Sequence, residues 1–172
     1  MIYTAHFDSP LGNITLAAKD NALAGLWIAG QKSILDRSTE PVAENCGVEP
    51  LAAALDWLRR YFDGGKPAAS ELRLAPEGSE IARSVWSILC EIPYGETTTY
   101  GAIANRIAKE RGMERMSAQA VGGAVGHNPI SIIIPCHRVI GSSGSLTGYA
   151  GGIDKKVWLL THEGLDMSKL RG

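Results

Sequence analysis

Cys136, His137 and Arg138 place a nucleophile, a base and a cation next to one another along the chain. The thiolate is the reactive form of cysteine, and nearby basic or cationic groups lower the pKa of a thiol from its usual value of about 8.5. His137 is therefore a candidate base for Cys136. Neighbours in an extended chain point to opposite sides, so we expect a bridging water to carry the proton between them. The alternative is a buried, inert cysteine beside a surface His–Arg pair, the usual setting of a free cysteine.

The remaining cysteines, Cys46 and Cys90, lie far from Cys136 in the sequence and form no CxxC pair. An odd number of widely spaced cysteines argues against a disulfide framework and against a cysteine-rich zinc site, and free thiols indicate a reducing compartment. We predict no metal site. The other histidines have no metal-ligand spacing with the cysteines and are predicted to be structural: His6, His127 and His162.

The elements around Cys136 are predicted to be mostly helical. Apolar residues at helical spacing indicate helices over residues 80–92, 100–111 and 153–162, and Ser117 can cap a further helix over residues 118–126. That last helix is built of alanine, valine and glycine, and with the helix before it suggests a helix-turn-helix. Small residues allow close contact with a neighbouring surface, which is either an external partner or the protein itself. The β-branched run at residues 130–134 is predicted to be a buried extended segment that stops at Pro135.

The N-terminal half is predicted to be a small antiparallel sheet with one helix. Residues 2–7, 13–18 and 22–28 are rich in β-formers and are separated by turn sequences, and residues 50–62 have helical periodicity that ends at Asp63-Gly64-Gly65. Residues 66–78 contain two prolines and a glycine and indicate a linker. We therefore predict an α/β (α+β) chain with one domain at residues 1–78 and a second at residues 79–172.

Composition and charge narrow the class of protein. The chain of 172 residues is 45% hydrophobic and 20% charged, which is typical of a globular protein, and no apolar run has the ~18 residues that cross a membrane. The N-terminus lacks the features of a secretion signal, so a cytoplasmic location is expected. The net charge of -1 divides into -3 for residues 1–79 and +2 for residues 80–172, which weakly favours the second half as the side that faces an anion.

The string Pro135-Cys136-His137-Arg138-Val139 resembles the active-site signature of the O6-alkylguanine-DNA alkyltransferases, also called methylated-DNA–protein-cysteine methyltransferases. The resemblance is strong over about residues 80–165 and loose before them. It includes further blocks in the order of the family: Tyr94-Gly95-Glu96, Thr99-Tyr100-Gly101, residues 120–124, Asn128-Pro129, residues 148–152, Trp158-Leu159-Leu160 and His162-Glu163-Gly164.

This resemblance implies a mechanism. Cys136 is then the nucleophile that accepts the alkyl group, His137 takes its proton through water, and Glu163 holds His137 in the required tautomer. Tyr100 is implied to hydrogen-bond N3 of the leaving guanine. The product is a thioether that no step regenerates, so each molecule reacts once and no cofactor is implied.

The resemblance also implies how DNA is held. Asn128 would tie the recognition helix to the active-site segment, and the backbone carbonyls of Cys136 and Val139 would accept from the guanine amino group. The recognition helix would lie in the minor groove of a duplex whose alkylated base is flipped out. The residues expected to contact DNA or the base are Ser117, Gln119, Ala120, Gly123, Asn128, Arg138, Val139, Tyr149 and Ala150.

One position departs from the family pattern. The family usually has an arginine where this chain has Gln119, and that arginine fills the gap left by the flipped base. Glutamine can hydrogen-bond the orphaned cytosine but carries no charge. We expect base flipping to be kept and duplex affinity to be weaker, with Arg115 as a residue that can compensate.

The resulting expectation is a monomeric suicide enzyme with a ribonuclease-H-like N-terminal domain and a mainly helical C-terminal domain. It would act on double-stranded DNA bearing O6-alkylguanine, and on O4-alkylthymine, with no membrane partner. Two alternatives remain open at this point. One is a non-catalytic binder of alkylated DNA, which the presence of Cys136 argues against, and the other is a cysteine hydrolase or transferase that turns over small molecules.

Overall fold

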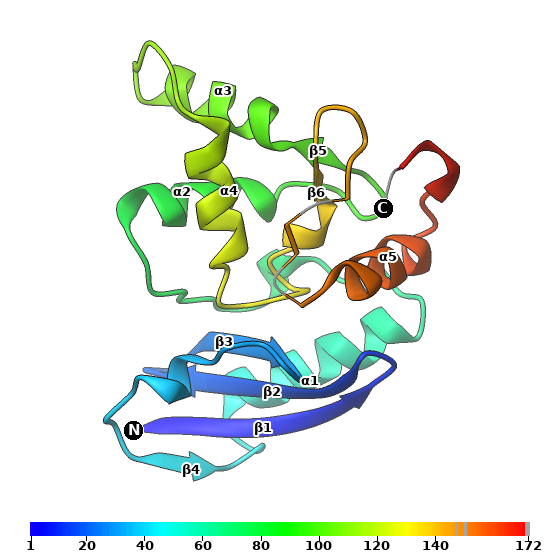
Figure 1. The fold of residues 1–172 in the computed structure, drawn as a ribbon. Coiled ribbons are helices and arrows are strands. Elements are labelled where there is room, and N and C mark those ends of the chain that lie inside the picture. The colour runs from blue at the N-terminus through cyan, green and yellow to red at the C-terminus, as the bar shows by residue number, and fades with distance from the viewer. Residues whose placement is uncertain (147, 150, 171–172) are drawn as a thin grey trace. The chain divides into compact units, whose positions relative to one another are not determined.

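The computed structural model describes residues 1–146, 148–149 and 151–170, and these form two compact units (Figure 1). The first unit comprises residues 1–77 and 129–133, and the second comprises residues 78–128 and 134–172. The chain thus returns to the first unit for five residues, just before the Pro135-Cys136 segment. The sequence carries no composition signal for this return.

The first unit is built on a four-stranded sheet with strand order β3-β2-β1-β4. Strands β1 and β2 and strands β2 and β3 pair antiparallel, whereas β4 pairs parallel with β1. Asp20 and Asn21 both have positive φ in the two-residue connection between β2 and β3, which is the backbone of a type I′ hairpin turn. The strands are β1 (Ile2–Ser9), β2 (Gly12–Lys19), β3 (Ala22–Ile28) and β4 (Val42–Glu44).

Helix α1 (Glu49–Phe62) packs on this sheet through one apolar face. Leu51, Ala54, Leu58 and Tyr61 are fully buried, at the i, i+3, i+7 and i+10 spacing of one helix face. The predicted helix at residues 50–62 is confirmed. The predicted linker after it is partly ordered, because the Leu23 backbone exchanges hydrogen bonds with residues 73 and 75.

The β-branched segment at residues 130–134 is buried as predicted, but it is not extended. The Ile133 N–H donates to the Ser131 carbonyl at 2.8 Å and closes a three-residue turn on Ile132, whose φ is +71°. A β-branched residue rarely adopts this backbone conformation. The turn arises because residues 129 and 131 hydrogen-bond with Leu26 of β3, after which the chain must leave the first unit.

The second unit is mainly helical, as predicted. Ser79, Thr99 and Ser117 begin three of its helices, each accepting a hydrogen bond from a backbone N–H three residues on. The helix predicted to reach Ile92 ends at Leu89 instead. The unit contains α2 (Glu80–Leu89), α3 (Tyr100–Glu110), α4 (Ala118–Gly126), α5 (Ile153–His162) and a short parallel pair, β5 (Thr98–Thr99) with β6 (Val139–Ile140).

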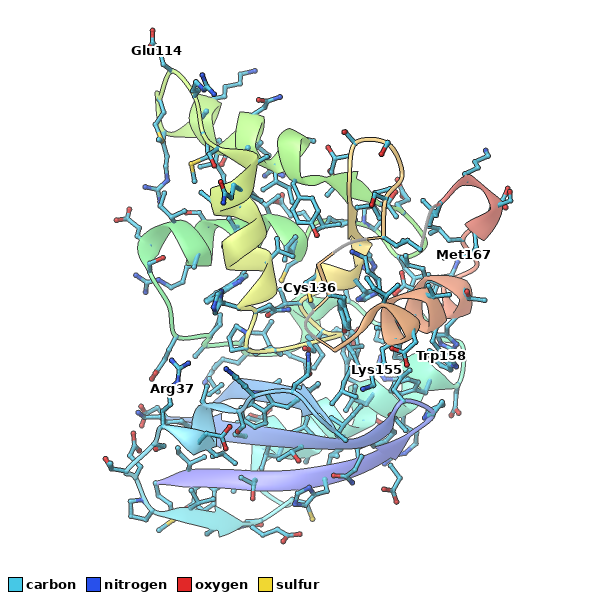
Figure 2. All side chains as sticks on the ribbon, in the orientation of Figure 1. Arg37, Glu114, Cys136, Lys155, Trp158 and Met167 are labelled. Carbon is cyan, nitrogen blue, oxygen red and sulfur yellow. The ribbon has the colours of Figure 1, made fainter. Side chains whose placement is uncertain are left out.

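Helices α3 and α4 form the predicted helix-turn-helix, and α2 packs against both of them. Val121 and Val125 point into the unit from α4, and the Trp86 indole of α2 donates to the Ala124 carbonyl at 2.9 Å. Figure 2 shows Glu114 at the tip of the loop that joins α3 to α4. Within the described residues, no helix is long and apolar enough to cross a membrane.

Candidate active site

Cys136 begins a single 3-10 turn, η3 (Cys136–Arg138), which packs against α5 and α2 (Figure 2). Pro135 precedes it with φ -81° and ψ 66°, and the Cys136 N–H donates back to the Ile134 carbonyl at 2.8 Å. This tight turn places the thiol inside the second unit, where Cys136 is 6% exposed. Because η3 is helical, Cys136 and His137 do not have the alternating orientation that the sequence predicts.

His137 is completely buried, and its Nε2 lies 2.6 Å from Oε2 of Glu163. A carboxylate can only accept a hydrogen bond, so with Glu163 ionised the proton of His137 lies on Nε2. The other ring nitrogen, Nδ1, has no hydrogen-bond partner among the described residues. This tautomer makes Nδ1 the atom of His137 that can accept a proton.

Glu163 lies directly after α5 and is 6% exposed. Its Oε1 accepts from the Gly95 N–H at 3.1 Å and from Nε of Arg138 at 2.8 Å. Its Oε2 accepts from His137 and from Nη2 of Arg138 at 3.1 Å. Burial raises the pKa of this carboxyl, but its hydrogen bonds with His137 and Arg138 outweigh burial and bring the pKa far below its usual value. Glu163 is therefore an anion throughout the neutral range.

The structure places Arg138 in an environment that differs from the expected one. The sequence predicts that it contacts DNA, but its side chain is only 9% exposed and its guanidinium bonds Glu163 and the Ile92 carbonyl. Each of the three guanidinium nitrogens thus donates one hydrogen bond to a partner inside the protein, and the DNA contact stays a prediction. The position of Arg138 favours a role within the second unit.

The electrostatic environment of the thiol contains opposing contributions. Burial raises the pKa of Cys136, while a hydrogen bond from the Asn128 side chain and the charge of Lys156 act to lower it. Burial lowers the pKa of His137, and Glu163 opposes this shift. A neutral imidazole beside a neutral thiol is thus the resting pair, and a proton must move when the thiol reacts.

Lys156 is a buried cation beside this pair that the sequence analysis did not identify. It is 1% exposed, its Nζ donates to the Val139 carbonyl at 2.5 Å, and burial lowers its pKa to about 8. A signal was present in the sequence, because Lys156 has helical spacing with the buried residues Leu159, Leu160 and Glu163. A lysine on the apolar face of a helix is a candidate site residue, since burying its charge is costly.

Tyr100 and Asn128 belong to the same unit as Cys136. Asn128 follows α4 and donates from Nδ2 to the Ile134 carbonyl at 2.8 Å. Tyr100 is half-buried at the start of α3, and its pKa is raised by burial and then by the charge of Cys136. A Cβ at Gly148 would lie 3.1 Å from the Tyr100 hydroxyl, so the glycine there permits a close approach. The roles implied for both residues remain predictions.

The residues expected to contact DNA from α4 share one exposed side of that helix. Ser117, Gln119, Ala120 and Gly123 are all exposed, while Val121 and Val125 on the other side are buried. Apart from its chain neighbours and the backbone of α4 itself, no atom lies within 4 Å of a Cβ built at Gly123, so packing in the described chain does not require a glycine there. Of the other two substrate residues at the active-site loop, Tyr149 is buried and Ala150 lies outside the described residues.

Two family models match the chain, and together they span nearly all of it. Residues 2–76 match the 6-O-methylguanine DNA methyltransferase ribonuclease-like domain, and residues 80–165 match the 6-O-methylguanine DNA methyltransferase DNA binding domain. The chain belongs to the 6-O-methylguanine DNA methyltransferase family. The resemblance drawn from the sequence is thereby confirmed, and so is the fold class, with a ribonuclease-like part followed by a helical part.

Curated relatives of this methyltransferase chain are similar over almost their whole length. A methylated-DNA–protein-cysteine methyltransferase of Methanosarcina acetivorans is 44% identical over 164 residues, covering 95% of this chain and 99% of the relative. The Mycobacterium tuberculosis protein of the same name is 42% identical over 165 residues, covering 95% and 93%. At this level of identity and coverage, the enzyme class holds for this chain.

Solved structures support the same assignment. The M. tuberculosis O6-methylguanine methyltransferase matches with a TM-score of 0.78 and 41% identity, covering 95% of this chain and 93% of that one. The M. tuberculosis OGT in complex with DNA matches with a TM-score of 0.77 and 40% identity, covering 99% and 95%.

Proposed function

We propose that this protein repairs DNA directly, by moving the alkyl group of O6-alkylguanine onto Sγ of its own Cys136. One observation carries the assignment of residues: His137, next to Cys136, is held on Nε2 by an ionised Glu163 while its Nδ1 has no partner among the described residues. With the proton of the ring on Nε2, the Nδ1 atom of His137 can accept the proton that the Cys136 thiol loses.

The transfer is a displacement at the alkyl carbon. The Cys136 thiol loses its proton to Nδ1 of His137 through water, a bond forms between Sγ and the alkyl carbon, and the bond from that carbon to O6 breaks. The electron pair of the broken bond stays on guanine, where a hydrogen bond from Tyr100 to N3 stabilises it. The guanine then takes up the proton that the thiol gave away, so the products are unmodified guanine and an S-alkylcysteine.

The thioether explains why each molecule would act once. The carbon–sulfur bond of a thioether is not broken by hydrolysis, so no step of the transfer regenerates the thiol, and the transfer itself involves no redox partner or cofactor. The protein is therefore a stoichiometric reagent, and a cysteine hydrolase, which releases its intermediate, is not favoured. A non-catalytic lesion binder is not favoured either, because Cys136 and its neighbouring base are both in place.

DNA is the proposed partner because the related OGT has been crystallised with it, and α4 has a surface suited to it. The exposed side of α4 carries small residues, and a glycine in a helix costs about 1 kcal/mol relative to alanine. Since packing in the described chain does not require Gly123, a close approach of an external surface explains it. A narrow minor groove is such a surface, and reaching O6 requires the base to be flipped out.

The direct test is the intact mass of the protein after incubation with a duplex containing one O6-methylguanine. We expect a gain of one methyl group on the peptide that contains Cys136, and no gain for Cys136→Ser under the same conditions. A methyl group on Cys46 or Cys90 would contradict the assignment of the nucleophile. Repair without any mass gain would favour a hydrolase.

Three further properties of the proposed enzyme are predictions that need their own tests. We expect a cytoplasmic location, action as a monomer, and activity on O4-alkylthymine as well as on O6-alkylguanine. Cell fractionation, light scattering and a duplex containing O4-methylthymine test them in turn.

A further inference from the structure

We propose that Arg138 is a positioning residue for the alkyl transfer. Its guanidinium keeps the Glu163 carboxylate in one orientation, and His137 then has Nδ1, not Nε2, as its proton acceptor. This inference rests on the proposed function of Cys136 and assigns a role to a side chain that the mechanism above does not use. It also replaces the DNA contact that the sequence predicts for Arg138.

The guanidinium makes a two-pronged contact with the carboxylate. Nε of Arg138 donates to Oε1 of Glu163 at 2.8 Å, and Nη2 donates to Oε2 at 3.1 Å. Two parallel bonds fix the plane and the rotation of a carboxylate, which a single ammonium cannot do. His137 bonds one of the same two oxygens, so the direction of its hydrogen bond depends on this orientation.

The guanidinium is itself held from two further directions. Its third nitrogen, Nη1, donates to the Ile92 carbonyl at 2.7 Å, just beyond the end of α2. The ring of Tyr94 lies 5.7 Å from the guanidinium carbon, within the range of a cation–π contact. The Tyr94 hydroxyl in turn donates to the His162 carbonyl at 3.3 Å, next to Glu163. Arg138 thus connects the segment after α2 to the end of α5.

The tautomer of His137 depends on the charge of Glu163. An ionised carboxylate can only accept, which requires the proton on Nε2 and frees Nδ1 for the thiol proton. A buried carboxyl without its cation has a raised pKa and, once protonated, can donate to Nε2. The ring proton would then lie on Nδ1, and His137 could not take a proton from Cys136. Arg138 prevents this change of tautomer, because its positive charge keeps Glu163 ionised.

Other charged and titratable groups face the same carboxylate and must be considered in any pH experiment. Tyr94 lies on the segment between α2 and β5, and His137 shares η3 with Arg138. Lys156 lies on α5 about two turns before Glu163, and its charge acts on His137, the partner of the carboxylate. Arg138 is the one among these that contacts both carboxylate oxygens with a permanent positive charge. Lysine, tyrosine and histidine all change charge between pH 5 and 11, whereas arginine does not.

The test compares Arg138→Met, Arg138→Lys and the wild type in single-turnover methyl transfer from pH 5 to pH 9, with the His137 tautomer followed by 15N NMR of the imidazole. Arg60→Met is the matched control, because Arg60 is also an ion-paired arginine, but it pairs with Asp56 and Glu71 on the exposed surface of α1. The NMR readout does not require transfer, so it separates a failure of this inference from a failure of the proposed function.

We expect Arg138→Met to slow transfer by about tenfold to a hundredfold, the effect of losing hydrogen bonds to a charged group. The loss should be larger at low pH, because Glu163 becomes protonated there once its cation is gone. The 15N chemical shifts of the His137 imidazole should change toward the values of the Nδ1-protonated tautomer. Arg138→Lys should show a smaller shift in the same direction, and Arg60→Met should match the wild type.

A second arm uses Glu163→Gln. Once the carboxylate is neutral, Arg138 has no charge left to orient, so we expect Arg138→Met in the Glu163→Gln background to cause no further loss. A loss that is uniform across pH, with the Nε2 proton retained, would show a purely structural ion pair and overturn the inference. If Arg138→Met does not fold, Arg138→Lys decides the matter, and an unchanged tautomer and pH profile in that variant would equally overturn it.

Discussion

Nε2 of His137 and Oε2 of Glu163 lie 2.6 Å apart, and both side chains are fully shielded from solvent. A hydrogen bond to a buried charge is costly to break, because the remaining partner keeps its desolvation penalty. The pair therefore contributes to both chemistry and stability, and substitutions at Glu163 must be designed to separate the two.

The substitution Glu163→Gln keeps the shape of the side chain and removes its negative charge. The amide can still accept from Nε2, but it no longer stabilises the imidazolium that forms when His137 takes the thiol proton. We expect methyl transfer to slow by about a hundredfold or more. Single-turnover kinetics measure this, with the unfolding temperature as the control for folding, and transfer at the wild-type rate would contradict the relay.

Lys156 gives a pH signature in stability. Its pKa is about 8 in the folded protein and 10.5 as its ordinary value, so between these pH values the unfolded chain binds a proton that the folded chain does not. Stability then rises with pH across this window, by about 3 kcal/mol for a shift of this size. Below pH 8 both states are protonated and the difference is constant.

Urea denaturation of wild type and Lys156→Met from pH 7 to pH 10.5 tests this prediction. We expect the difference between the two free energies of unfolding to change in favour of the wild type as pH rises, and parallel profiles would contradict it. Methyl transfer by Lys156→Met should also be slower at neutral pH, because the cation that lowers the pKa of Cys136 is lost.

The substitution Gln119→Arg tests whether the glutamine at this position weakens DNA binding. The residue is exposed in the first turn of α4, and the resemblance places an arginine at this position. Gln119→Arg should bind duplex DNA more tightly and repair faster, because it adds a cation to the residue that is expected to fill the gap left by the flipped base, within a polyanionic duplex. Binding and repair rates at two salt concentrations provide the measurement. If neither DNA affinity nor repair rate improves, Gln119 does not cause the weaker duplex affinity that we expect.

Gly123 tests whether α4 is the DNA-facing helix. The Cβ of a leucine there has no atom within 4 Å outside its chain neighbours and the backbone of α4, and leucine improves helix propensity, so the fold should be retained. The added bulk should weaken duplex binding by about tenfold or more, a cost of ~1.4 kcal/mol. Ala52→Leu on the exposed side of α1 is the control and should bind as the wild type does. Equal binding by both variants would remove α4 from the interface.

The helices were predictable because their apolar residues recur at helical spacing, and three of them also begin at a capping side chain. Ser79, Thr99 and Ser117 all cap as their positions suggest, and the buried face of α1 follows its periodicity. Strand β4 was missed, since Val42–Glu44 is short and largely exposed and has no alternation to detect. Its pairing with β1 depends on a contact that is distant in sequence.

The geometry around Cys136 was less predictable. The run at residues 130–134 has the composition of a strand, but hydrogen bonds with Leu26 and the turn at Ile132 decide its path. The resemblance to the family places Arg138 among the DNA-contacting residues, and no local pattern indicates a partner inside the protein. Its actual partner, Glu163, lies 25 residues away and was assigned to His137 alone. Such shared partners come from tertiary structure, which local patterns do not contain.

The most direct test of the account is the stoichiometry of methyl transfer from duplex DNA in large excess over the protein. The account predicts that transfer stops at one methyl group per protein molecule, with all of it on Cys136, and that further lesions remain unrepaired. Continued repair beyond one equivalent, or repair by the Cys136→Ala protein, would contradict it.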